Sequence, residues 1–226
     1  MSLSEQIPIG KRIPNIPHAV SVSLPTMADV IGYEKRDPRI LAKMNSGYPR
    51  FVKHEWLREI EIYWESLFDK PGNTVWLTSS EKIAHQLETH LDTPGTKFQK
   101  HLGVSGLRIP DDEQLNRKAK LFLQHVGGYL CSRQAEDYLV ANGLKKQIES
   151  EALYSGDAEA KILESIRPLL NAEKCDDIIL SNCGMNAIYA AFQAVNEIQA
   201  PKGRKSWIKL GWLYTDTMSI LDKLSH

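Results

Sequence analysis

The most informative segment of this 226-residue chain is Ile178-Ile179-Leu180-Ser181-Asn182-Cys183-Gly184-Met185-Asn186. Its apolar first half predicts a buried strand, and the alanine-rich stretch from Met185 to Glu197 predicts a helix. A turn of small residues that opens a helix exposes backbone N–H groups at the positive end of the helix dipole. The segment therefore predicts an anion site that suits phosphate. The simpler interpretation is that Gly184 only permits the bend while Asn182 or Ser181 caps the helix.

Strands and helices are predicted to alternate on the N-terminal side of this segment and after it. The expected strands are 74–78, 103–109, 178–181 and 206–210. The expected helices are 37–45, 53–68, 80–91, 112–141 with a break at the glycine pair 127–128, 158–170, 185–197 and 217–224. Residues 1–32 are proline-rich without a helical period, which predicts an extended arm. This order indicates an α/β fold with a parallel sheet. We expect three regions: the arm with a short helix at 1–50, an inserted helical and α/β region at 51–175, and the start of a larger domain at 176–226.

The composition of the chain argues against several classes of function. The 28 basic and 28 acidic side chains cancel, so the chain lacks the net positive charge of a nucleic-acid-binding protein. Its apolar runs are too short to cross a bilayer and its N-terminus has no apolar signal core, so we expect a cytoplasmic protein without a membrane partner. Three cysteines without C-x-x-C spacing, and histidines without a helical pair, predict neither disulfides nor a metal site.

Two further segments carry candidate binding residues. In Ser46-Gly47-Tyr48-Pro49-Arg50-Phe51, a phenol and a guanidinium lie two residues apart in an extended segment, and the guanidinium suits forked phosphate recognition. In 210–217, a predicted strand end leads into a helix, where open α/β sheets bind ligands. Tyr214 in this segment could stack on a planar ring or could be a core aromatic residue.

Taken in order, these segments resemble the fungal-type cystathionine γ-synthases, which are pyridoxal 5′-phosphate (PLP) dependent enzymes of Cys/Met metabolism with an aspartate-aminotransferase-like fold. The residues that carry the resemblance are His18–Thr26, Val30–Glu34, Ser46–Phe51, Cys183–Tyr189 and Tyr214–Thr217. The resemblance is strongest at the two ends of the chain and weak between residues 70 and 175.

The resemblance implies a role for each candidate residue. Tyr48 and Arg50 would reach the PLP phosphate of a neighbouring subunit, so a homo-oligomer is implied. Gly184 and Met185 would donate backbone N–H groups to the phosphate of their own subunit's PLP. Tyr214 would lie over the pyridine ring, although Thr215-Asp216 replaces the glycine pair usual after this tyrosine.

The resemblance also implies that part of the enzyme is missing. PLP chemistry needs a lysine that binds the cofactor and an acidic residue at the pyridine nitrogen, and in this family both lie beyond the equivalent of His226. We therefore interpret the chain as the N-terminal part of an enzyme that joins an activated homoserine ester to cysteine by γ-replacement. We expect no catalytic residue in this chain and a C-terminal half as its partner.

Two other functions remain open. The chain could be a non-catalytic truncated or split-gene partner that assembles with a full-length paralogue. It could also be a cysteine-nucleophile enzyme, because a helix N-terminus favours the thiolate of Cys183.

Overall fold

The computed structural model describes residues 7–44, 53–68 and 72–225. These residues form two compact units, each with its own internal contacts. Unit 1 contains the chain up to Gln124 together with Gly128–Ile148, and unit 2 contains His125–Gly127 together with Glu149–His226. Among the described residues, no helix is long and apolar enough to span a membrane.

The centre of unit 1 is a three-stranded antiparallel sheet in the order β3-β5-β4. The strands are β3 (Asn73–Thr78), β4 (Lys97–His101) and β5 (Val104–Pro110). β5 is the middle strand, with Leu107 opposite Trp76 on one side and opposite Phe98 on the other. Every residue of β5 except Pro110 is buried, as expected of a strand that is paired at both edges and covered on both faces.

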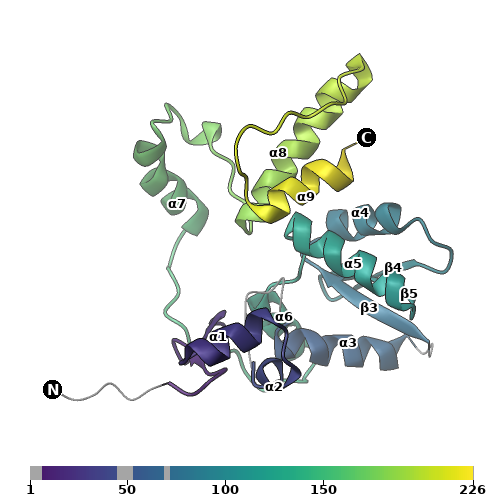
Figure 1. The fold of residues 1–226 in the computed structure, drawn as a ribbon. Coiled ribbons are helices and arrows are strands. Elements are labelled where there is room, and N and C mark those ends of the chain that lie inside the picture. Colours follow the sequence, from purple (N-terminus) through teal and green to yellow (C-terminus); the bar gives the residue numbers. More distant parts are fainter. Residues whose placement is uncertain (1–6, 45–52, 69–71, 226) are drawn as a thin grey trace. The chain divides into compact units, whose positions relative to one another are not determined.

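Helices cover both faces of this sheet (Figure 1). The helices α3 (Glu55–Leu67) and α6 (Ser132–Ala141) lie on one side, and α4 (Glu81–Leu91) and α5 (Glu113–Val126) lie on the other. The core between the sheet and the first pair is built from the apolar stripe of α3, inward residues of β3 and one face of α6. Its members are Trp56, Leu57, Ile60, Trp64, Val75, Leu77, Val104, Leu130, Ala135, Tyr138 and Leu139. Helical spacing in α3 therefore produces a core stripe, in which Trp56, Ile60 and Trp64 are buried, whereas Leu67 in the last turn is 42% exposed.

The N-terminal part of unit 1 is a short hairpin followed by two short helices. The two strands of the hairpin, β1 (Arg12–Ile13) and β2 (Ser21–Val22), pair antiparallel. Thr26 and Asp29 form a reciprocal capping box at the start of α1 (Met27–Glu34), and Pro38 opens α2 (Pro38–Leu41). Helix α1 was not among the helices expected from the sequence, because its local signal is the cap formed by Thr26 and Asp29 and the residues before it are rich in proline.

Unit 2 consists of helices and irregular segments in the residues that the structure describes. Its helices are α7 (Ala158–Ile166), α8 (Gly184–Gln199) and α9 (Thr215–Leu224). Three short 3-10 turns, Arg167–Leu170, Cys175–Asp177 and Ala200–Lys202, interrupt the connections. Helices α8 and α9 pack on each other.

The prediction of a parallel sheet is wrong for the described residues. Both sheets are antiparallel, and the segments 178–181 and 206–210 form no strand. Ile179 is 91% exposed and Ile208 is 85% exposed. An apolar run becomes a strand only when another strand takes its N–H and C=O groups, and the described part of unit 2 contains no strand.

Several other predicted elements are confirmed. The strands over 74–78 and 103–109 are β3 and β5, and the helix after Ser80 is α4, capped by the Ser80 hydroxyl, which accepts a hydrogen bond from Ile83 N at 3.3 Å. Asp157 caps α7 by accepting from Ala160 N at 2.9 Å. The predicted helix over 112–141 is two helices, α5 and α6, separated at the glycine pair.

Candidate functional site

The start of α8 is an uncapped helix end. Cys183 is the N-cap residue, in an extended conformation, and its side chain makes no hydrogen bond to the first turn. Gly184 is exposed, and a Cβ atom built on it would meet no atom within 4 Å. The side chain of Met185 is buried, so this residue offers only its backbone N–H group. The dipole of this 16-residue helix favours an anion at its N-terminus.

Neither polar residue expected as a cap performs that role. The Ser181 hydroxyl donates to Asn186 Oδ1 at 2.7 Å, and Asn182 Nδ2 lies 3.5 Å from Gly127 O. The capping interpretation is therefore wrong for both Asn182 and Ser181. Their side chains stabilise the bend instead.

Gly127 holds this bend from outside the segment. Gly127 O accepts from Cys183 Sγ at 3.8 Å, and Val126 O accepts from Asn186 Nδ2 at 3.2 Å. The φ angle of Gly127 is +62°, in the left-handed region, and a Cβ atom on it would collide with Cys183 Sγ and lie 2.9 Å from Asn186 N. Only glycine fits here, because both the backbone angle and the close approach exclude a side chain.

Replacing Gly127 with alanine is expected to destabilise unit 2 by about 2–4 kcal/mol, from left-handed backbone strain and the collision with the start of α8. Chemical denaturation followed by circular dichroism measures this loss. Gly203→Ala is the matched control: its φ is +77°, but nothing lies within 4 Å of the added Cβ, so only the backbone cost of about 1–2 kcal/mol remains. Equal losses of stability in the two variants would show that the close contact of residue 127 with Cys183 and Asn186 does not contribute to the effect.

Tyr214 is the N-cap residue of α9 and is 53% exposed. The core alternative for this aromatic residue is therefore wrong. Because α9 packs on α8, Tyr214 lies in the same unit as Gly184 and Met185. The predicted phosphate contacts Tyr48 and Arg50 lie outside the described residues.

Three polar residues of unit 2, His125, Asp216 and Lys223, contact one another, and no sequence motif predicted this contact. His125 Nδ1 lies 3.4 Å from Asp216 Oδ1, and His125 Nε2 lies 3.3 Å from Lys223 Nζ. His125 and Asp216 are both buried, and Asp216 is in the first turn of α9, two residues after Tyr214. Because an ammonium group only donates, His125 Nε2 accepts a hydrogen bond from Lys223, and these contacts orient the start of α9. His125 lies 98 positions before Lys223 in the chain, so spacing could not reveal the contact.

Lysines and cysteines near this region have structural partners. Lys209 Nζ forms an ion pair with Asp222 at 2.6 Å. Cys183 Sγ donates to a backbone carbonyl, and no histidine is paired with it in the contacts of the described chain. No group of three histidine, cysteine or acidic side chains in the described ranges could hold a metal ion.

Comparison with known proteins identifies relatives of this chain. It is 35% identical over 93% of its length to an L-2-amino-4-chloropent-4-enoate dechlorinase/desaturase of Streptantibioticus cattleyicolor, of which it covers 42%. It is 39% identical over 61% of its length to a cystathionine gamma-synthase of Saccharomyces cerevisiae, of which it covers 25%. It is 25% identical over 90% of its length to the cystathionine gamma-synthase-like protein ankD of Aspergillus thermomutatus, of which it covers 44%.

These matches confirm the resemblance to cystathionine γ-synthase-like proteins that the motifs predict. The chain spans less than half the length of each of these three relatives. No family model matches the chain, and no solved structure matches it significantly.

Proposed function

We propose that this chain, a relative of the cystathionine γ-synthase-like proteins, forms the N-terminal part of a PLP-dependent enzyme. The observation that carries the proposal is the open start of α8 at Gly184 and Met185, in a chain related to a family that uses PLP. PLP, when bound, supplies an electron sink that stabilises negative charge on an amino-acid substrate. The reaction that we propose for the whole enzyme is γ-replacement on an activated homoserine ester by cysteine.

Each residue in this proposal binds or orients a group. The backbone N–H groups of Gly184 and Met185 donate to the phosphate, and the helix dipole of α8 favours its negative charge. The exposed ring of Tyr214 would stack on the pyridine ring and exclude water from it. Asp216 and His125 orient the start of α9 and with it Tyr214. Tyr48 and Arg50 bind phosphate across a subunit interface.

PLP binding by this chain is tested by equilibrium dialysis against PLP and against pyridoxal, which lacks the phosphate. We expect PLP to bind at least about tenfold more tightly than pyridoxal, because each charge-assisted hydrogen bond to the phosphate contributes about 1.5–3 kcal/mol. Inorganic phosphate should compete. Equal binding of the two compounds would contradict the proposal.

A second candidate function is that of a non-catalytic partner of a full-length paralogue. It is favoured by the apolar side chains that unit 2 leaves uncovered: Leu210 is 83% exposed and Trp212 is 92% exposed. Surfaces of this kind mark sites of association. The enzyme function implies a homo-oligomer, which sedimentation velocity measures, and a monodisperse monomer would contradict that function. A mixed assembly of this chain with the Saccharomyces cerevisiae cystathionine gamma-synthase would favour the partner function.

A further inference from the structure

The outer strand β3 of unit 1 has a second edge that no strand of the described residues pairs with. β5 pairs with β3 along the other edge, from Asn73 to Thr78. An outer strand presents unpaired N–H and C=O groups on its second edge, and these can pair with another chain. We call this second edge of β3 the free edge. It belongs to unit 1, whereas the candidate phosphate site at α8 belongs to unit 2, so its role does not depend on the proposed function.

The C-terminal end of the free edge is closed by the backbone that follows α5. Thr78 and Tyr129 form an isolated antiparallel bridge, and Ser79 N donates to Gly128 O at 2.8 Å. No other residue of β3 forms such a bridge in the part of the chain that the structure describes. Trp76, in the middle of β3, is nevertheless only 6% exposed. Side chains therefore cover the middle of this strand.

One of these covers is a lysine that contacts groups from both faces of the sheet. Lys53 Nζ pairs with Glu61 Oε1 of α3 at 2.7 Å and lies 4.0 Å from the centre of the Trp76 ring. The helices α3 and α5 lie on opposite faces of the sheet (Figure 1). Val75 packs in the core with α3, whereas Trp76 points to the other face, where its Nε1 donates to Asn116 Oδ1 of α5 at 3.0 Å. Because β5 occupies the other edge of β3, Lys53 lies across the free edge.

The pair of Lys53 and Glu61 is largely withdrawn from water, unlike an ordinary surface ion pair. The two side chains are only 23% and 15% exposed. Burial, the largest effect, raises the pKa of Glu61, against the charge and the hydrogen bond of Lys53, which lower it. A strand that approached the free edge would push the lysine stem aside and leave the Glu61 carboxylate without its cation. Separating a buried carboxylate from its partner is strongly unfavourable.

A simpler interpretation is that this pair only fixes the residues before α3. That role needs the contact with Glu61, but it does not need the ammonium group to lie over Trp76, a ring that points to the other face of the sheet. Natural sheets protect their outer strands with charged side chains, and lysine is used most often for this purpose. The face of the indole ring also attracts the ammonium group, which holds the lysine at the edge.

We propose that Lys53, held by Glu61, closes the free edge of β3 against antiparallel pairing with the same edge of a second copy of this chain. The sequence of β3, Asn73–Thr78, is rich in residues that favour strands, and two identical edges can pair around a twofold axis. While the lysine is in place, the free edge stays unpaired. Without it, the N–H and C=O groups in the middle of β3 are open to a second strand.

Hydrogen exchange of the full chain at low and at high protein concentration tests this role, with Lys53→Ala compared with the wild type. In the wild type, the exchange of the β3 amides should not depend on concentration. In Lys53→Ala, the amides on the free edge should gain about tenfold or more in protection at high concentration, because they acquire hydrogen-bond partners. The β3 amides that bond to β5 are the internal reference. No gain in Lys53→Ala, or an equal gain in the wild type, would overturn the proposal.

Three further variants separate the position of the lysine from other effects. Lys161→Ala removes the same charge from an exposed ion pair in α7, so β3 should not change. Lys53→Arg keeps a cation that binds a carboxylate and stacks on an aromatic ring, so the edge should stay closed. Glu61→Gln unties the lysine with little change in volume and should open the edge even if Lys53→Ala does not fold. A gain in Lys161→Ala or Lys53→Arg as large as that expected of Lys53→Ala, or no gain in Glu61→Gln, would refute the role of Lys53.

Discussion

Replacing Gly184 with aspartate is expected to weaken PLP binding about a hundredfold while leaving unit 2 at least as stable. A carboxylate at the first position of α8 repels the phosphate and competes for the same amides, which removes about 3 kcal/mol of charge-assisted hydrogen bonding. A carboxylate near an exposed helix N-terminus also stabilises the helix by about 0.3–1 kcal/mol, because it interacts favourably with the helix dipole. Binding by equilibrium dialysis and stability by thermal unfolding should therefore change in opposite directions.

Gly184→Ala is the matched control for this prediction. Gly184 is not in the left-handed region, and an added Cβ meets nothing within 4 Å, so alanine leaves the amides unchanged. We expect PLP binding within about twofold of the wild type, because no hydrogen bond or charge changes. If alanine weakened binding as much as aspartate did, a requirement for glycine, and not the charge at the helix end, would explain the effect.

The largest expected loss of stability follows from Trp64→Ala in the core of unit 1. Trp64 is fully buried, and its Nε1 donates to the Tyr138 hydroxyl at 2.7 Å. Truncating a buried tryptophan costs about 3–5 kcal/mol, which is a large part of the 5–15 kcal/mol that stabilises an ordinary domain. Urea denaturation followed by circular dichroism should show unit 1 unfolded at a much lower concentration.

Tyr138→Phe separates the hydrogen bond from the packing. It removes the hydroxyl that accepts from Trp64 and that lies 2.6 Å from His101 Nδ1, and it keeps the ring. The expected loss is about 1–3 kcal/mol, the cost of a buried donor without a partner. A loss as large as that of Trp64→Ala would mean that the polar contact, and not the cavity, determines the stability of this core.

The sequence predicted those elements that carry their own local signals. Helices α4 and α7 lie where the sequence predicted helices, and each is capped by a polar side chain. The helix predicted over 53–68 is α3, whose Trp56, Ile60 and Trp64 are buried. The strands predicted at 178–181 and 206–210 do not form, because a strand needs a partner strand and the described part of unit 2 contains none. A short apolar segment has the same composition whether it is paired and buried or unpaired and exposed, so its composition could not show which of the two it is.

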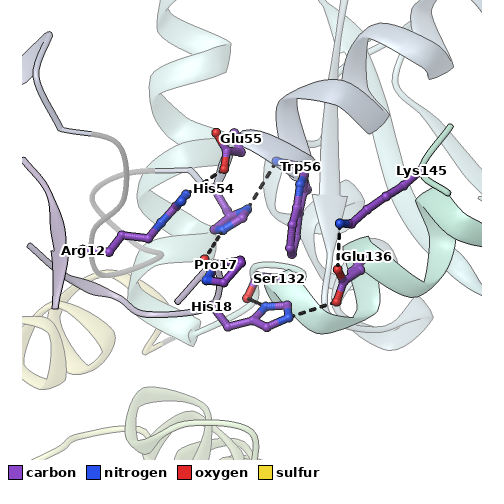
Figure 2. Close-up of polar contacts among 9 residues, drawn as sticks. All are labelled: Arg12, Pro17, His18, His54, Glu55, Trp56, Ser132, Glu136 and Lys145. Atoms are coloured by element: carbon purple, nitrogen blue, oxygen red, sulfur yellow. Dashed lines mark hydrogen bonds and ion pairs between the residues drawn. The ribbon is translucent and has the colours of Figure 1, made fainter. Parts of the chain in front are cut away.

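The candidate site was predictable only where it depends on a local sequence pattern. The bend before Gly184 followed from small residues at the start of a helix, and the structure shows a helix that begins at Gly184 without a side-chain cap. The support from Gly127, and the contact of His125 with Asp216, join residues far apart in the chain. Local patterns do not record such contacts, and the same holds for the contact of His18 Nε2 with Glu136 Oε2 in unit 1 (Figure 2).

The most direct test of a phosphate site at α8 is an amide NMR titration of the ¹⁵N-labelled chain with PLP, with pyridoxal in parallel. We predict that the N–H resonances of Gly184 and Met185 shift most when PLP is added. Inorganic phosphate should reproduce these shifts, and pyridoxal should not. Binding of PLP that leaves both amides unshifted, or that shifts them equally with pyridoxal, would contradict it.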